Sequence, residues 1–318
     1  MSERVFRLGL IGAGRMGRTH LRALEGSTKV AVTAVVEPIE AARSALAGIG
    51  MAAFDDVGQL LDAGGIDGVL IAAPSDRHLE LVTQVAAAGL PILCEKPCGL
   101  SSAEIQAAGE AVELHGVPFQ VAYWRRYVPA LRALRKRIQD GELGETHLFA
   151  SFQWDGEPPA ASFRARSGGI FIDMGVHEFD QIRWLSGQEI GDLSVASAPP
   201  VEEVGVWKDV DSAQAIAPLS GGATAFVSLG RYFPGGDMAR IEAFGTRDAV
   251  RIDFLDPKDG ERAQLDALLR QAEGFATFAT GGPRSGASIE DAAAALGAAE
   301  RASAGIHQLS PALAGGRS

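Results

Sequence analysis

The apolar stretch 168–185 carries a histidine and an aspartate whose types suit acid–base chemistry. Asp173 and His177 lie four residues apart in GGIFIDMGVHEFDQIRWL, and Asp180 follows three residues later. On a helix these spacings place side chains on one face. A neutral imidazole can take the proton of an alcohol, while the carboxylate one turn earlier either orients the ring or binds a neighbouring hydroxyl. Gly175 between them is expected to let another backbone or a cofactor come close.

The alternative is a packing helix whose few polar residues are satisfied within the core. The apolar residues of the stretch are numerous enough to pack a buried rod on their own. Asp180 is interpreted as a structural carboxylate or a support for the other two. Motifs elsewhere in the chain are needed to distinguish a catalytic helix from a structural one.

A second chemical candidate is the tripeptide Glu95-Lys96-Pro97, at the end of the apolar run LPILC. Such a run is typical of a buried strand, so Lys96 is expected where the core meets a crevice. Its ammonium could hold a substrate hydroxyl and stabilise the alkoxide that forms as hydride leaves. The alternative is a lysine that pairs with a carboxylate at a strand end, and position alone favours neither.

The segment GLIGAGRMGRTH places Gly12, Gly14 and Gly17 in the spacing GxGxxG. It follows a predicted strand and opens a predicted helix, and Glu37 ends the next strand. This context is that of a dinucleotide-binding fingerprint, whose glycines permit a tight turn, approach of the pyrophosphate and helix–strand packing. Glu37 is expected to bind ribose hydroxyls and to repel a 2′-phosphate, which favours NAD over NADP. Arg43, interpreted as a surface cation, is the residue that could instead reach a 2′-phosphate.

Dinucleotides bind at the carboxyl ends of the strands in such sheets. The segment AAPSDRH at 72–78 ends the third predicted strand, and Ser75 or Asp76 can cap the helix that follows. His78 is either a ligand contact or a surface histidine in the first turn of that helix. The predicted cofactor-binding residues are Gly12, Ala13, Gly14, Arg15, Met16, Gly17, Glu37, Ala73, Pro74, Ser75, His78, Glu95 and Lys96.

The order of elements predicts an α/β fold with two domains. Residues 1–124 alternate apolar strands with helices, which indicates a parallel sheet covered on both faces. Residues 125–318 begin with a basic amphipathic helix at 129–141 and continue with strands that have few helices between them, which favours a largely antiparallel sheet. The predicted strands are 146–154, 192–198, 212–219, 223–230, 239–245 and 249–254, with a hairpin turn at 220–222 and a closing helix at 288–306.

Composition narrows the class of protein further. The 318 residues carry a formal net charge of −11 without a basic block, which argues against nucleic acid and anionic membranes as partners. The two cysteines, Cys94 and Cys98, are interpreted as reduced thiols, and their spacing predicts no structural metal. The N-terminal segment lacks a leader pattern and no apolar run is long enough to span a bilayer, so the predicted location is the cytoplasm.

Three motifs in this order resemble the glucose–fructose oxidoreductase / inositol dehydrogenase / rhizopine catabolism (Gfo/Idh/MocA) family over essentially the whole chain: LGLIGAGRMGRTH, AAPSDRHLELVTQVAAAGLPILCEKP and GGIFIDMGVHEFDQIRWL. The resemblance implies a Rossmann domain and then an α+β domain with a large, mostly antiparallel sheet, whose open face often forms a homodimer or homotetramer. It implies hydride transfer between a nicotinamide cofactor, here NAD, and a sugar, cyclitol or related polyol. The family's E-K-P lysine maps to Lys96, and its D-x-x-x-H pair maps to Asp173 and His177.

Within the family, the chain looks most like inositol 2-dehydrogenases, on the segment AYWRRYVP at 122–129. It departs from them at 151–169, where Gln153, Trp154 and Asp155 stand in place of the polar pocket residues expected for inositol. Arg164 and Arg166 in the same segment either contact the substrate or lie on the surface, and they are interpreted as surface residues. The predicted catalytic residues are Lys96, Asp173 and His177, and the predicted substrate contacts are these three and Trp154.

Two other functions stay open at this point. An aldose 1-dehydrogenase or a keto-sugar reductase would use the same fold and the same residues. A non-catalytic NAD-sensing regulatory protein would keep the fold without the chemistry, and the presence of Lys96, Asp173 and His177 argues against it. All three functions predict a bound NAD, and the two enzymes differ in the polyol or sugar that they accept.

Overall fold

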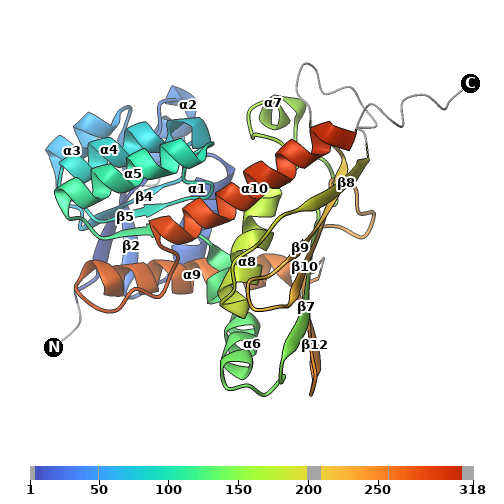
Figure 1. Cartoon of the computed structure of the whole chain (residues 1–318). Coiled ribbons are helices and arrows are strands. Elements are labelled where there is room, and N and C mark those ends of the chain that lie inside the picture. Colours follow the sequence, from blue (N-terminus) through green and yellow to red (C-terminus); the bar gives the residue numbers. More distant parts are fainter. Residues whose placement is uncertain (1–3, 49, 199–208, 257, 310–318) are drawn as a thin grey trace, which may run out of the picture. The chain divides into compact units, whose positions relative to one another are not determined.

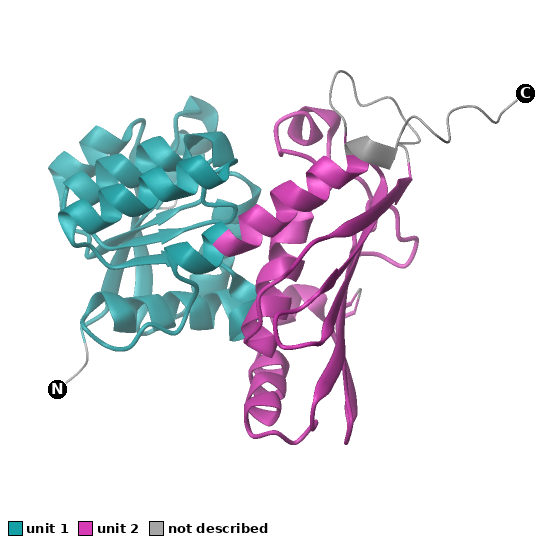
Figure 2. Ribbon diagram, viewed as in Figure 1, with its two compact units in different colours: residues 1–127, 265–293 teal, residues 128–264, 294–318 magenta. Residues whose placement is uncertain are grey.

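The structure is a computed structural model and describes residues 4–48, 50–198, 209–256 and 258–309. The chain forms two compact units, which Figure 2 distinguishes by colour. The first unit comprises residues 1–127 and 265–293, and the second comprises residues 128–264 and 294–318. The predicted division at 124–125 assigned every later residue to the second domain, whereas in the structure residues 265–293 belong to the first unit.

Six parallel strands form sheet A of the first unit, in the order β3-β2-β1-β4-β5-β6. This is the strand order of the Rossmann dinucleotide-binding fold, in which the order reverses between β1 and β4. The predicted parallel α/β domain is therefore confirmed. The strands are β1 (Phe6–Ile11), β2 (Val30–Val36), β3 (Ala52–Phe54), β4 (Gly68–Ile71), β5 (Ile92–Cys94) and β6 (Phe119–Val121).

Helices cover both faces of sheet A. On one face, Phe275 of α9 (Gly260–Ala279) joins the core made by Phe6 and Leu8, and the rings of Phe6 and Phe275 meet edge to face with centroids 6.1 Å apart. On the other face of β1, Gly9 lies against Leu60 of α3, and Figure 1 shows α3, α4 and α5 forming this layer. The remaining helices of the unit are α1 (Arg15–Leu24), α2 (Glu40–Gly48), α3 (Val57–Ala63), α4 (His78–Ala87), α5 (Ser102–His115) and the 3-10 turns η1 (Ser75–Arg77) and η2 (Trp124–Tyr127).

Sheet B of the second unit has the order β12-β11-β7-β10-β9-β8. All neighbouring strands are antiparallel except β7 and β10, which run parallel, so the predicted mostly antiparallel sheet is confirmed. Because β7 and β10 are parallel, their carboxyl ends meet at one edge of the sheet. The strands are β7 (Thr146–Trp154), β8 (Ser194–Ala198), β9 (Ser212–Pro218), β10 (Thr224–Gly230), β11 (Met238–Gly245) and β12 (Ala249–Leu255).

The two faces of sheet B differ in what they bury. Alternate residues of β9, such as Ala213 and Ala215, are buried, whereas Ile216 between two such residues is 49% exposed. Figure 1 shows α6 and α8 on one face only, and within the described residues of this unit no helix covers the other face. The helices of the unit are α6 (Pro129–Gln139), α7 (Ala161–Arg164), α8 (Val176–Ser186) and α10 (Ile289–Leu309), the first turn of which belongs to the first unit.

The stretch 168–185 is not one continuous α-helix. A π-helical turn covers Phe171–Gly175, and α8 begins only at Val176. A π turn holds more residues than an α turn, so the spacing of Asp173 and His177 cannot be taken as regular α-helical spacing. The prediction for Gly175 was wrong, because Phe171, Phe179 and Leu229 occupy the space beside it and leave no room for a cofactor or a backbone.

Candidate active site

The three glycines of the loop after β1 differ in what surrounds them. Gly12 has a φ of +93°, and a Cβ there would lie 2.8 Å from the backbone oxygen of Ala72 at the end of β4. A Cβ on Gly17 would collide with the backbone oxygen of Gly12. A Cβ on Gly14 would meet nothing within 4 Å. The first and third glycines are thus required by packing, while the second leaves open space at the start of α1, where an anion can approach the helix N–H groups.

Glu37 ties the end of β2 to this loop. Its buried carboxylate accepts hydrogen bonds from the backbone N–H of Ala13 at 3.0 Å and of Ile39 at 2.9 Å. Each carboxylate oxygen has two lone pairs, so both oxygens can still accept a hydroxyl of a ribose. Arg43 donates to the backbone oxygens of Glu37 and Pro38 at 2.8 and 3.1 Å. The loop, the open space at Gly14 and Glu37 together fit the adenosine and pyrophosphate of NAD.

His78 is not a surface residue, so that interpretation was wrong. His78 is 1% exposed, because the first turn of α4 lies against the loop after β4 and the segment after β5. Nδ1 lies 2.8 Å from the backbone oxygen of Pro97, and Nε2 lies 2.8 Å from that of Ala73. Burial lowers the pKa of His78, although both carbonyls favour the protonated ring. Both nitrogens face protein atoms, which favours a structural role over the predicted direct contact with the cofactor.

Glu95 is also buried among protein atoms. One carboxylate oxygen lies 2.6 Å from Nε2 of His20 on α1, and the other accepts the backbone N–H of Lys96 at 3.2 Å. The peptide bond between Lys96 and Pro97 is cis. Of the three residues in this motif, Glu95 and Pro97 are buried and Lys96 is half-buried, so only the lysine side chain reaches solvent.

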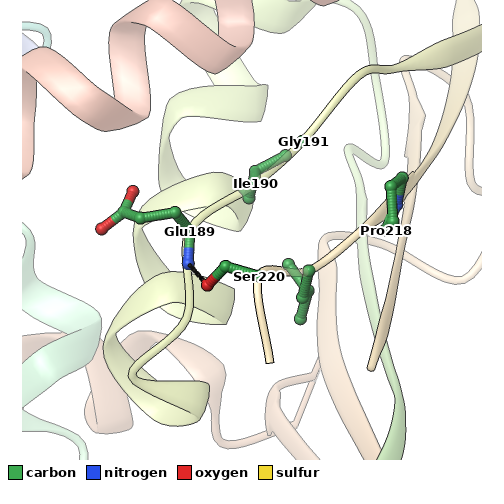
Figure 3. Close-up of a pocket in the computed structure, with 6 residues that line it drawn as sticks. Glu189, Ile190, Gly191, Pro218 and Ser220 are labelled. Atoms are coloured by element: carbon green, nitrogen blue, oxygen red, sulfur yellow. Dashed lines mark hydrogen bonds between the residues drawn. The ribbon is translucent and has the colours of Figure 1, made fainter. Parts of the chain in front are cut away.

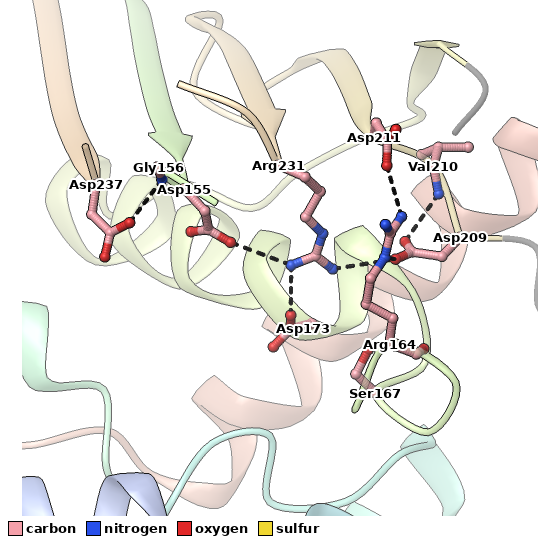
Figure 4. Close-up of polar contacts among 10 residues, drawn as sticks. All are labelled: Asp155, Gly156, Arg164, Ser167, Asp173, Asp209, Val210, Asp211, Arg231 and Asp237. Atoms are coloured by element: carbon pink, nitrogen blue, oxygen red, sulfur yellow. Dashed lines mark hydrogen bonds and ion pairs between the residues drawn. The ribbon is translucent and has the colours of Figure 1, made fainter. Parts of the chain in front are cut away.

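In the second unit, Arg231 follows β10, and its guanidinium lies next to three carboxylates (Figure 4). The guanidinium is fully buried, and its Nη1 donates to Asp173 at 2.9 Å and lies 3.4 Å from Asp155, which follows the parallel strand β7. Its Nη2 lies 3.6 Å from Asp209. The parallel pair β7–β10 thus brings Asp155 and Arg231 to one edge, and Arg231 fixes the predicted site residue Asp173.

Arg164 was predicted to lie on the surface, and this is wrong. Its side chain is 4% exposed and donates to Asp209 at 2.7 Å and to Asp211 at 2.9 Å (Figure 4). Those two carboxylates precede β9 and attract the guanidinium into the unit, because a buried charge requires a partner of opposite sign. Arg166, two residues later, is exposed as predicted.

Two guanidinium groups therefore face four carboxylates in this cluster, which consists of Arg164, Arg231, Asp155, Asp173, Asp209 and Asp211. Burial raises the pKa of Asp155, against the opposing effect of Arg231, and the charge of Asp173 raises it further. None of Arg231, Asp209 and Asp211 was predicted as a site residue. The one signal in the sequence was an arginine directly after a strand, which belongs to no known motif.

His177 is 7% exposed, and Glu178, Asp180 and Gln181, which follow it on α8, are more deeply buried. Glu178 accepts a hydrogen bond from the hydroxyl of Ser151 on β7, and Gln181 donates to the same hydroxyl at 3.1 Å. These contacts anchor α8 to sheet B through polar groups. Asp180 is 1% exposed, in keeping with a structural carboxylate. Trp154 donates from Nε1 to Ser228 at 3.2 Å and covers Gly230.

Two surface depressions lie apart from the predicted catalytic residues. One, of about 190 Å³, lies at the β9–β10 turn between Glu189, Gly191 and Ser220, where the hydroxyl of Ser220 accepts the N–H of Glu189 (Figure 3). The other, of about 420 Å³, lies beside Arg15 and Arg18 on α1. Within the described segments, no group of three or more potential ligands could hold a metal ion, and none of the helices has the length and apolarity to cross a membrane.

The Rossmann order of sheet A and its glycine loop define a dinucleotide-binding protein, here joined to a second α+β unit. The chain belongs to the Gfo/Idh/MocA family of oxidoreductases. The family model for the NAD-binding Rossmann fold matches residues 6–123, and the model for the family's C-terminal domain matches residues 131–251. The resemblance drawn from the three sequence motifs is thereby confirmed.

Two relatives match most of the chain. The rhizopine catabolism protein MocA of Rhizobium meliloti is 49% identical over 297 residues, which cover 93% of this chain and 94% of that protein. An inositol 2-dehydrogenase of Rhizobium meliloti (strain 1021) is 34% identical over 265 residues, 83% of this chain and 80% of that enzyme. The crystal structure of scyllo-inositol dehydrogenase from Lactobacillus casei with NAD(H) and scyllo-inositol has the same fold, with a TM-score of 0.85 at 24% identity over 96% of this chain and 98% of that one.

Proposed function

We propose that this protein is an NAD-dependent dehydrogenase that oxidises a secondary hydroxyl of a cyclitol of the inositol type, or of a related sugar, to the ketone. The observation that carries the proposal is the geometry of the glycine loop with Glu37, which fits NAD, in a chain that is similar to MocA over 93% of its length and to an inositol 2-dehydrogenase over 83%. The resemblance to these relatives favours a cyclitol over an aldose.

Three residues of the chain carry out the proposed chemistry. Lys96 holds the reacting oxygen and stabilises its negative charge. His177 takes the hydroxyl proton as general base. Asp173, which accepts a hydrogen bond from Arg231, either orients the imidazole or binds a neighbouring hydroxyl of the substrate. NAD, when bound, supplies the carbon that accepts the hydride. Trp154 contacts Ser228 on the face of sheet B that carries Phe226, opposite the face on which Ser151 contacts α8, so we leave it out of the proposed site.

A spectrophotometric panel tests this function. The purified protein is incubated with NAD and, one at a time, with inositol isomers and aldoses, and the formation of NADH is followed. We expect turnover with at least one inositol. Turnover with aldoses alone would instead identify an aldose 1-dehydrogenase, and turnover seen only with NADH and a keto-sugar would identify a reductase. Absence of turnover, with NAD binding intact by calorimetry, would identify an NAD sensor.

The cofactor preference yields a prediction about Glu37. We expect the native protein to use NAD about a hundredfold more efficiently than NADP, because a 2′-phosphate would lie beside a buried carboxylate. Glu37→Ser should reduce this ratio of kcat/KM values at least tenfold. Glu40→Ser, at an exposed glutamate of the following helix, is the matched control and should leave the ratio unchanged. Equal use of both cofactors by the native protein would refute the assignment.

We further propose that the protein forms a homodimer or homotetramer through the uncovered face of sheet B. Phe152 and Phe226 stack edge to face there with centroids 5.8 Å apart, and Ile216 pairs with Phe226 across the strands. Phe244 on the same face is 40% exposed. The face thus carries partly exposed apolar side chains, with the guanidinium of Arg240 over the ring of Phe152, and exposed apolar groups beside charged ones are typical of a protein interface.

Light scattering after gel filtration measures this association. We expect Phe226→Glu to convert the oligomer into smaller species, because a carboxylate at the centre of an apolar interface would be buried without a partner. Phe163→Glu, at a phenylalanine of α7 that is 42% exposed, is the matched control and should keep the native mass. A native protein that runs as a monomer would contradict the proposal. We also propose the cytoplasm as the location, since both cysteines are free thiols.

A further inference from the structure

Two buried histidines of the first unit contact the Glu95-Lys96-Pro97 motif, and neither has a role in the proposed reaction. His20 lies on α1, two turns after the glycine loop, and His78 begins α4. His20 is 0% exposed and His78 is 1% exposed. A buried polar ring is retained only where its nitrogens find partners, so the contacts of each ring show what it stabilises.

His20 fixes the residue before Lys96. Its Nε2 lies 2.6 Å from a carboxylate oxygen of Glu95, the distance of a strong, charge-assisted hydrogen bond. Among the described residues, Nδ1 of His20 has no hydrogen-bond partner, so we assign the proton to Nε2, which faces the carboxylate. The second oxygen of Glu95 accepts the backbone N–H of Lys96 itself at 3.2 Å. The carboxylate therefore links the helix of the glycine loop to the backbone of the lysine.

His78 fixes the residue after Lys96. Its ring lies between the backbone oxygen of Pro97 and that of Ala73, at 2.8 Å from each. Ala73 lies in the loop that follows β4, next to the contact between Ala72 and Gly12. A neutral imidazole carries one N–H, so one of the two carbonyls accepts its hydrogen bond, while the other carbonyl packs against the second nitrogen of the small rigid ring. The motif is thus held on both sides, by α1 through His20 and by the β4 loop through His78.

We propose that His20 and His78 are positioning residues that hold the side chain of Lys96 at the reacting oxygen, so that the loop that binds NAD also places the lysine. The inference rests on the proposed function of Lys96. It adds that α1, the helix after the glycine loop, is connected to the backbone of Lys96 through His20 and Glu95. A lysine on a flexible four-carbon chain gains most from such support, because an error of about 1 Å at the reacting group can cost about a hundredfold in rate.

The test uses His20→Phe, which keeps a ring but removes the hydrogen bond, and His20→Gln, which keeps an N–H donor. His20→Phe should lower kcat about tenfold to a hundredfold, while the Kd for NAD, measured by calorimetry, stays within about threefold of the native value. His20→Gln should restore at least a third of the native kcat. His78→Phe and His78→Gln should differ from each other in the same way. His115→Phe, at an exposed histidine of α5, is the matched control and should keep native kcat.

A second measurement follows Lys96 without relying on activity. Its amine is labelled with acetic anhydride, and the modified fraction is determined by mass spectrometry, with exposed Lys136 as internal reference. In His20→Phe, we expect the labelling rate of Lys96 relative to Lys136 to rise at least threefold, because the released side chain spends more time in solvent. This result would stand even if every substrate panel were negative, so failure of the proposed function and failure of the inference are distinguishable.

If His20→Phe does not fold, Glu95→Gln takes its place in the test, because this variant leaves no unpaired charge in the core. It keeps the shape of the side chain but weakens its hydrogen bonds with His20 and Lys96, and it should lower kcat at least fivefold and raise Lys96 labelling. The proposal is overturned if folded His20→Phe or, in its place, Glu95→Gln keeps both native kcat and native Lys96 labelling. It is also overturned if His20→Gln is as impaired as His20→Phe, since bulk alone would then explain the loss.

Discussion

His177→Ala and Lys96→Ala are each expected to lower kcat about a thousandfold while the affinity for NAD stays within about threefold of native. His177 supplies the base for the hydroxyl proton, and alanine leaves only water in that role. Lys96 supplies the cation for the developing alkoxide. The adenosine and pyrophosphate of NAD are held by the glycine loop and Glu37, which neither substitution touches. Stopped-flow turnover and calorimetry with NAD measure the two quantities separately.

Exposed residues of the same types provide the controls. His115→Ala and Lys136→Ala should each keep kcat within twofold of native, because neither side chain lies in a buried contact. Retention of more than a tenth of native kcat by either His177→Ala or Lys96→Ala, on the substrate found in the panel, would remove that residue from the proposed mechanism. Loss of NAD binding together with turnover would instead indicate a structural role.

Arg231→Met should be the most damaging single change to the stability of the second unit. The fully buried guanidinium contacts Asp155, Asp173 and Asp209, and its removal leaves these carboxylates with too little positive charge. Removing one partner of a buried ion pair costs about 3–5 kcal/mol of unfolding free energy. Urea denaturation measures the loss. Arg251→Met breaks an exposed pair with Asp253 and should cost no more than about 0.5 kcal/mol.

The loss caused by Arg231→Met should depend on pH in a defined direction. Burial already raises the pKa of Asp155, and Arg231 opposes this rise. Without Arg231 the pKa in the folded state rises further above that of the unfolded chain, so the folded state takes up protons more readily as the pH falls. The deficit of the variant relative to native protein should therefore shrink between about pH 8 and about pH 5. A deficit below about 1 kcal/mol, or one that grows on acidification, would contradict the role assigned to Arg231.

The first unit could be predicted well because its chemistry is local. The glycine loop, Glu37 and the alternation of strands and helices all lie within short segments, and sheet A has the strand order that they imply. The short elements β3 and α3 were missed, since three residues in a strand and seven in a helix carry little periodicity. Helix α9 was also missed, although Leu265, Leu268, Ala272 and Phe275 recur at helical spacing, so the signal was present in the sequence.

The polar cluster of the second unit could not be predicted from a single sequence, because its residues lie far apart along the chain. Arg231 and Asp173 are 58 residues apart, and only the parallel pairing of β7 with β10 brings Asp155 beside them. Arg164 was assigned to the surface because an isolated arginine usually lies there, and the carboxylates that bury it follow 45 and 47 residues later. Sequence spacing suggested Asp173 and His177 as a pair but assumed a regular α-helix, whereas the π turn changes the geometry between them.

The return of the chain to the first unit has a consequence for biosynthesis. Sheet A is complete once residue 121 has been made, yet the face formed by Phe6 and Leu8 receives Phe275 only much later. At ribosomal rates of synthesis, this apolar face stays uncovered for on the order of ten seconds, while the strands of sheet B are translated. The N-terminal half of the nascent chain therefore exposes an unfinished core throughout that interval. We expect such a chain to bind chaperones during synthesis, and its two units to reach their native state together, after the last helices have left the ribosome.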